Sequence, residues 1–195
     1  MCLLAAPIEC SAYMSDRYVH HSDEQLFELM SESKQEAFGE IYARYRSRIY
    51  AYILRMIGDR DRADDIFQET FTRIYRHCFG ENRDINKASS YIFTTARNRC
   101  LNAIRDRKAT TDVEDYHQIV FQPSYENAEL AELVKRSLEL LPDHYRESFV
   151  LREYDGLSYQ EIAEITGQTL ASVKIHIFRA KKKLREILMP YLEEA

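Results

Sequence analysis

Apolar residues recur at intervals of three and four along most of the chain after Ser22, which is the spacing of one face of an α-helix. The longest such stripe ends at Gly58 and consists of Phe38, Ile41, Tyr42, Tyr45, Ile49, Tyr52, Ile53 and Met56. Two capping boxes, Ser22 with Gln25 and Ser33 with Glu36, predict that helices start at these serines, because each pair satisfies free backbone N–H groups.

Two more helices follow in the first half of the chain. Similar spacing predicts one helix from Asp61 to about Gly80, and another that starts after Asn86 and runs to about Lys108. Residues 22–108 are therefore predicted to form one helical domain. We expect residues 1–21 to be a disordered tail and attach no function to them.

The helical period is lost over residues 109–124, which contain Pro123 and read as a flexible linker. Residues 109–141 as a whole carry seven acidic and two basic side chains. Helical spacing resumes at Tyr125, and Pro142 occupies the place of a first-turn proline in a further helix that Gly156 ends. The fold class is therefore all-α, with two helical domains joined by a linker, the second covering residues 125–195.

The second domain contains the sharpest local signal. Ser158 and Glu161 form a capping box, Gly167 ends the short helix, and Thr169 can cap a last helix that reaches Leu188. Helix, short glycine-containing turn and helix make a helix-turn-helix, whose second helix can enter a DNA major groove. Any helical hairpin can imitate this pattern, so the pattern alone is only moderately specific.

Local charge strengthens the DNA interpretation, although the whole chain carries a net charge of −5. The segment from Thr169 to Arg185 holds six basic residues and no acidic one, and residues 86–108 hold six basic residues against Asp106. Tyr91 and Phe93 accompany the second group, and rings beside cations suit an unpaired base. A solvated basic face and a buried Tyr91 are the plainer alternatives.

Acidic residues gather instead on the third predicted helix, at Asp61, Asp64, Asp65 and Glu69. Asp65 and Glu69 share a face with Gln68 beside them, so they could hold a divalent ion or meet a basic helix of another protein. No histidine or further carboxylate converges there in the sequence, and we expect no metal and no cofactor.

Other classes of protein are poorly supported by the sequence. No apolar run approaches the roughly 18 residues of a membrane span, so we expect a cytoplasmic protein with no membrane contact. The four cysteines, Cys2, Cys10, Cys78 and Cys100, show no spacing typical of zinc ligands and read as reduced thiols.

Three segments resemble motifs of one protein family, the extracytoplasmic-function (ECF) sigma factors of bacterial RNA polymerase. They are GDRDRADDIFQETFTRIYR (58–76), SSYIFTTARNRCLNAIR (89–105) and LPDHYRESFVLREYDGLSYQEIAEITGQTLASVKIHIFRAKKKLRE (141–186). The resemblance covers about residues 23–108 (sigma region 2) and 125–189 (sigma region 4). It implies a non-enzymatic subunit that binds core RNA polymerase, directs initiation at specific promoters and melts them, with an anti-sigma or recruiting protein as a possible partner.

The resemblance also assigns residues to roles. Polymerase binding falls to Asp65, Gln68 and Glu69, and the unpaired downstream promoter element to Asn82, Lys87, Tyr91, Arg97 and Asn98. Contact with the double-stranded upstream promoter element is assigned to residues at the start of and along the last helix, namely Thr169, Ser172, Lys174, Ile175, His176, Arg179 and Lys181.

Three departures from the family pattern stand out. Tyr91 replaces the usual Trp, Asn102 replaces the usual Asp, and apolar Ile175 and Phe178 stand with His176 where the family tends to be polar or cationic. Because an apolar side chain can contact only a thymine methyl, we predict that the upstream element is read weakly, through phosphates. Ile175 and Phe178 could instead bind an anti-sigma protein.

Competing interpretations remain open from the sequence. A stand-alone helix-turn-helix regulator offers no reason for the acidic group around Asp65. An enzyme that uses Asp64, Asp65 and Glu69 with a metal ion lacks a phosphate loop or a nucleophile–base pair. A protein that sequesters a helical partner is a third possibility.

Overall fold

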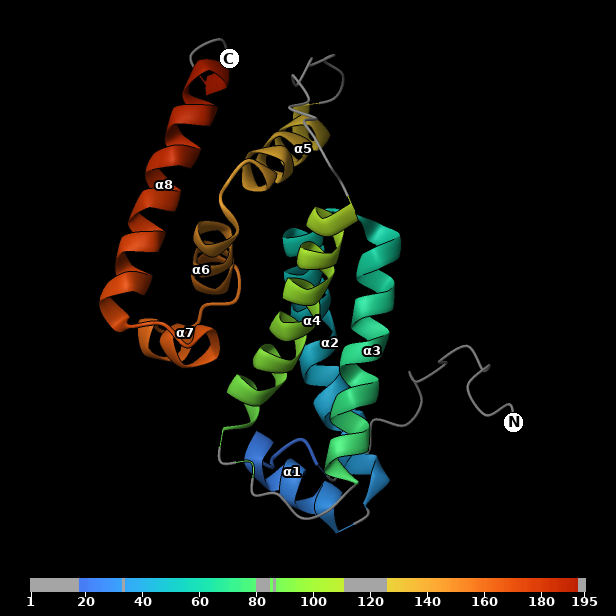
Figure 1. The fold of residues 1–195 in the computed structure, drawn as a ribbon. Coiled ribbons are helices and arrows are strands. Elements are labelled where there is room, and N and C mark those ends of the chain that lie inside the picture. The colour runs from blue at the N-terminus through green and yellow to red at the C-terminus, as the bar shows by residue number, and fades with distance from the viewer. Residues whose placement is uncertain (1–17, 33, 80–84, 86, 111–125, 193–195) are drawn as a thin grey trace.

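The computed structural model describes residues 18–192 except 33, 80–84, 86 and 111–125. The described residues form eight helices and no strand, as the sequence predicted (Figure 1). The helices are α1 (Asp23–Ser31), α2 (Gln35–Ile57), α3 (Arg60–Cys78), α4 (Ala88–Thr110), α5 (Glu126–Glu139), α6 (Asp143–Glu153), α7 (Tyr159–Thr166) and α8 (Leu170–Leu192).

Local sequence signals set most of the helix ends. The Ser22 and Ser158 capping boxes are both formed, and Gly58 and Gly167 end α2 and α7 in the left-handed conformation that glycine adopts most easily. The predicted box at Ser33 is wrong, because α2 has Lys34 as its N-cap without a side-chain hydrogen bond, and Ser33 itself lies outside the described residues.

Helices α1–α4 form the N-terminal lobe. In Figure 1, α2, α3 and α4 run side by side as an upright bundle, with α1 across its lower end. Six of the eight residues in the predicted apolar stripe of α2 are buried, and Phe38 and Tyr42 are half-buried. Tyr52 and Phe93 are among the largest fully buried side chains. This bundle holds α3 and α4 with their polar faces outward.

Helices α5–α8 form the C-terminal lobe. The α7–turn–α8 unit is the predicted helix-turn-helix, and α6 packs against both of its helices. Val173, Ile177, Ala180 and Leu184 are buried on one face of α8 as their spacing predicted. Pro142 is the N-cap of α6 and therefore lies one position before the predicted first turn.

The two lobes pack directly against each other. Helix α6 contacts α2, and α7 contacts α4. One buried apolar cluster therefore continues from the N-terminal bundle into the C-terminal lobe. Leu151 and Ile162 belong to the same cluster as Tyr52 and Phe93. The sequence predicted a linker between two domains but did not predict this contact, and residues 111–124 of the predicted linker (109–124) lie outside the described residues.

Candidate nucleic-acid interfaces

The predicted polymerase-binding residues form an exposed strip on α3, which we call the acidic ridge (Asp65, Gln68 and Glu69). Ala63, Ile66 and Thr70 face the core, so helical spacing turns the ridge to solvent. Glu69 is 61% exposed and accepts one hydrogen bond from the guanidinium of Arg99 at 3.2 Å. The ridge is therefore an accessible carboxylate and amide surface.

Tyr91 lies on α4, close to one end of the N-terminal bundle, and is partly buried. Its ring stacks on His77, with 5.1 Å between ring centroids and 26° between the planes, and the edge of Phe27 lies 5.9 Å away. Asn98 is exposed further along α4, whereas Asn82 lies outside the described residues. The predicted base-stacking residue thus sits in an aromatic group that His77 and Phe27 complete.

Two predicted DNA-binding cations, Lys87 just before α4 and Arg97 on α4, are both engaged by the C-terminal lobe. Lys87 pairs with Glu164 of α7 at 2.7 Å, and Arg97 pairs with Glu147 of α6 at 2.8 Å. Lys87 stays 65% exposed, but only 18% of the Arg97 side chain reaches solvent. In this arrangement Arg97 offers little surface to a nucleic acid.

Glu147, the acid that engages Arg97, was not singled out from the sequence. Its side chain is 3% exposed and accepts from Arg97 Nε at 2.8 Å and from the Tyr52 hydroxyl at 3.3 Å. Burial raises the pKa of Glu147, while the charge and hydrogen bond of Arg97 oppose that rise. The available signal was helical spacing, which places Glu147 on the same face as the buried Val150 and Leu151, and a buried carboxylate needs a partner.

The exposed face of α8 carries the predicted upstream-DNA residues. Thr169 caps the helix by accepting from Ser172 N at 3.1 Å, and Lys174, Ile175 and Arg179 are exposed. Lys181, also exposed, pairs with Glu153 at 2.9 Å. Apart from Ser172 and His176, which are half-buried, the predicted contact residues are thus available on one helix.

His176 differs from its neighbours because it belongs to a ring cluster. Its ring lies 4.8 Å from that of His144 and 5.3 Å from that of Tyr145, whose hydroxyl accepts from Arg179 at 3.0 Å. Desolvation lowers the pKa of His176, and the charges of His144 and Arg179 add to this effect. These contacts pack α8 against α6.

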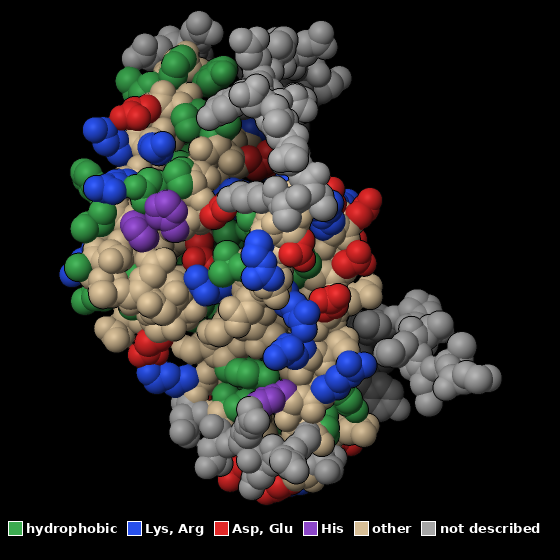
Figure 2. Space-filling model, in the orientation of Figure 1, with side chains coloured by type: hydrophobic (Ala, Val, Ile, Leu, Met, Phe, Trp, Pro, Cys, Tyr) green, Lys and Arg blue, Asp and Glu red, His purple; other side chains and the backbone are tan. Residues whose placement is uncertain are grey.

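Apolar side chains interrupt the basic surface of α8. Figure 2 shows hydrophobic, basic and histidine side chains together along the α6 and α8 side of the molecule. Phe178 is 69% exposed, with Ile175 at 48% and Leu170 at 40%. This helix therefore presents large apolar side chains beside its basic ones.

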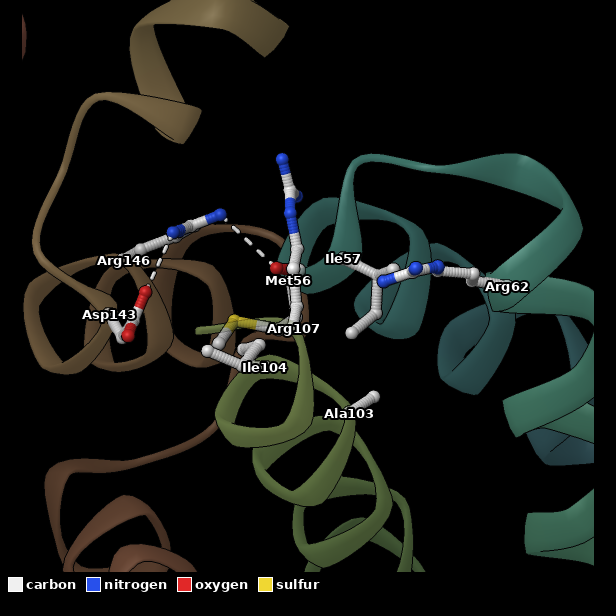
Figure 3. Close-up of a pocket in the computed structure, with 8 residues that line it drawn as sticks. All are labelled: Met56, Ile57, Arg62, Ala103, Ile104, Arg107, Asp143 and Arg146. Atoms are coloured by element: carbon white, nitrogen blue, oxygen red, sulfur yellow. Dashed lines mark hydrogen bonds and ion pairs between the residues drawn. The ribbon is translucent and has the colours of Figure 1, made fainter. Parts of the chain in front are cut away.

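A pocket of about 260 Å³ lies where the lobes meet (Figure 3). Arg146 crosses it, donating to the backbone carbonyl of Met56 at 3.1 Å and to Asp143 at 2.9 Å. The other lining residues are Ile57, Arg62, Ala103, Ile104 and Arg107, which include no nucleophile–base pair. Across the described part of the chain, no group of three or more His, Cys, Asp or Glu side chains could hold a metal ion.

Two family models match the chain. Sigma-70 region 2 matches residues 41–110, which span α2 to α4, and sigma-70 region 4 matches residues 131–184. Among the described helices, none has the length and apolarity needed to cross a membrane.

Curated relatives match nearly their whole length. ECF RNA polymerase sigma factor SigW of Bacillus subtilis is 33% identical over 79% of this chain and 90% of its own. SigM of the same organism is 30% identical over 76% of this chain and 93% of its own. The RNA polymerase sigma-H factor of Pseudomonas aeruginosa is 30% identical over 89% of this chain and 97% of its own.

Solved structures share the fold. CnrH, in complex with the cytosolic domain of CnrY, aligns with a TM-score of 0.67 and 25% identity over 86% of this chain and 97% of that one. The sigma factor RpoE of Bartonella quintana, in complex with the anti-sigma factor NepR, has a TM-score of 0.60 and 21% identity over 78% and 96%, and shows the fold alone.

Proposed function

Because this chain belongs to the ECF family of RNA polymerase sigma factors and directs transcription initiation, we propose that its surfaces divide that task. Residues 22–108 act as sigma region 2, residues 125–195 act as sigma region 4, residues 109–124 link them, and residues 1–21 form a tail. The protein acts in the cytoplasm as a non-catalytic subunit. The observation that carries this assignment is that an acidic ridge on α3 and basic side chains on α4 and α8 are exposed on the same chain.

The acidic ridge docks on core RNA polymerase. Its support is the exposure of all three side chains on one face of α3, together with a match to sigma-70 region 2 over the same helix. A carboxylate surface fits a basic helix of the enzyme, and such complementarity controls both the association rate and the specificity.

Reversing one charge of the ridge tests this docking. Asp65→Lys should abolish capture of core polymerase by the tagged full-length chain, because it sets like charges against each other. Glu28→Lys, an exposed position on α1, is the matched control and should bind normally. Equal capture of both variants would refute the assignment, and capture of no polymerase by the wild type would refute the polymerase role itself.

The downstream promoter element is melted and held by α4 and the segment before it. Asn82, Lys87, Tyr91, Arg97 and Asn98 supply a ring, two cations and two amides. Unstacking bases costs a few kcal/mol, which ring stacking and phosphate contacts must offset. The support is their placement on or just before one helix, with Tyr91 held at its N-terminal end.

The upstream element is contacted by α8 in the major groove. Lys174, Arg179 and Lys181 reach phosphates, Thr169, Ser172 and His176 flank them, and Ile175 offers a base only an apolar contact. We therefore expect weak sequence reading upstream. Transcription from a series of promoter variants tests this expectation, and loss of transcription on upstream changes alone would contradict it.

An anti-sigma protein is a further proposed partner. Ile175 and Phe178, three positions apart on α8, are exposed apolar side chains that DNA phosphates do not need. A stand-alone regulator remains less favoured than a sigma factor, because such a regulator leaves the acidic ridge without a role.

A further inference from the structure

We propose that the contact between the two lobes is an autoinhibited state, in which acidic residues of the C-terminal lobe occupy the cations that hold single-stranded promoter DNA. Glu147 engages Arg97 and Glu164 engages Lys87. This inference rests on the proposed function in one respect, the assignment of Lys87 and Arg97 to DNA.

The Arg97–Glu147 ion pair is the central polar contact between the lobes. Arg97 donates through Nε to Glu147 Oε1 at 2.8 Å and through Nη2 to Oε2 at 3.4 Å, so both carboxylate oxygens are engaged. Tyr52, itself fully buried, donates to Oε1 at 3.3 Å. A buried charge without its partner is strongly unfavourable, so neither member of this pair can leave alone while the lobes stay together.

Further polar contacts surround the central pair. Arg48 of α2 donates to the backbone carbonyl of Asp155 at 3.0 Å, beyond the end of α6. The contact of Arg146 with the Met56 carbonyl joins the lobes on another side. Arg55 lies over the ring of Tyr154 at 3.9 Å from its centroid. These contacts order the lobes in one relative position.

Apolar packing supplies the attraction between the lobes. Leu151, Leu157 and Ile162 from the C-terminal lobe lie in the same buried cluster as Tyr52 and Phe93 from the N-terminal lobe. Apolar burial is nondirectional, so the ion pairs decide the register in which the lobes meet.

Binding of DNA by α4 and closure of the lobes are mutually exclusive. A phosphate that approached Arg97 would have to displace both oxygens of Glu147 from a side chain that is 18% exposed. A carboxylate therefore occupies the position of a phosphate. The acidic ridge lies on α3 outside this contact and stays exposed, so the closed protein can still meet polymerase.

The test removes two acids from the lobe contact. Glu147→Gln with Glu164→Gln should expand the full-length chain, seen as a larger radius of gyration by X-ray scattering. Its affinity for a fluorescein-labelled, mixed-sequence single-stranded DNA should rise at least about tenfold, because the closed state then buries an uncompensated Arg97. Glu186→Gln, an exposed acid on α8, removes the same kind of charge and should change neither.

A third substitution tests whether the increase in DNA affinity depends on Arg97. Adding Arg97→Ala to the double variant removes both the uncompensated buried charge and the proposed DNA contact, so most of the increase in affinity should be lost and the chain should become compact again. Circular dichroism checks that each variant folds. Should the double variant fail to fold, Glu164→Lys sets a like charge against Lys87 at the exposed edge and should open the lobes in the same way.

Two results overturn the proposal. The first is a double variant whose radius of gyration equals that of Glu186→Gln, and the second is a double variant that expands without binding DNA more tightly. Capture of polymerase through Asp65 is measured separately. A result against autoinhibition by the lobe contact can therefore be distinguished from a result against the sigma-factor assignment.

Discussion

Asp155 should limit the stability of this protein at neutral pH. It follows α6, its side chain is 4% exposed, and Arg48 Nε is 4.0 Å from Oδ1. The other carboxylate oxygen, Oδ2, is buried and has no hydrogen-bond partner among the described residues. Burial raises the pKa of Asp155 from 3.8 to about 6, although Arg48 and Arg55 pull it down.

The size of the effect follows from this shift. A rise of about two pKa units corresponds to roughly 3 kcal/mol, because each unit is worth about 1.4 kcal/mol. A carboxyl with a raised folded-state pKa contributes its full stability below pH 3.8 and loses it as the pH rises through about 6. At pH 7 the folded protein therefore bears most of the cost of a buried charge.

Asp155→Asn removes this cost while keeping the shape of the side chain. We expect its free energy of unfolding at about pH 7 to exceed that of the wild type by up to ~3 kcal/mol. The advantage should shrink as the pH falls through about 6 and vanish near pH 4. Urea unfolding, followed by circular dichroism across this range, measures the difference.

Glu161→Gln provides a control of opposite sign. Hydrogen bonds from the side chain and backbone of Ser158 lower the pKa of Glu161, so its charged form stabilises α7 at neutral pH. This substitution should destabilise there. The reasoning fails if Asp155→Asn destabilises at neutral pH, or if its effect is the same at all pH values.

Two other substitutions test the helix-turn-helix. Ser158→Ala leaves Glu161 N without its acceptor and should cost about 1 kcal/mol in urea unfolding, whereas Ser158→Gly should cost only a few tenths; equal losses would contradict a capping role. Arg179→Ala should lower the slope of log affinity against log salt for duplex promoter DNA by about 1. Lys183→Ala is the exposed control for the latter, and an unchanged slope for Arg179→Ala would exclude a phosphate contact.

The residues of the acidic ridge and of α8 could be placed from the sequence because helical spacing alone separates buried from exposed positions. Val173 and Ile177 are buried, whereas Ile175 and Phe178 are exposed, as the period requires. The environment of Tyr91 could not be predicted, since His77 belongs to another helix.

Helix boundaries were predicted where the signal is local. The Ser158 box and the turn at Gly167 depend on residues within a few positions of each other, so their patterns carry most of the information. The predicted start of α2 at Ser33 was wrong by one position. The Lys34 N–H donates to the Leu29 carbonyl at 3.1 Å, and Lys34 becomes the N-cap of α2.

By itself, then, the sequence determined eight amphipathic helices, their order and the charged faces that each presents. Only the tertiary structure decided which of those faces meet. Arg97 and Glu147 are fifty positions apart, and a charge on a helix is equally compatible with solvent, DNA or a distant carboxylate. The packing of α6 on α2 and of α7 on α4 selects the carboxylate, because it buries both groups where each needs the other.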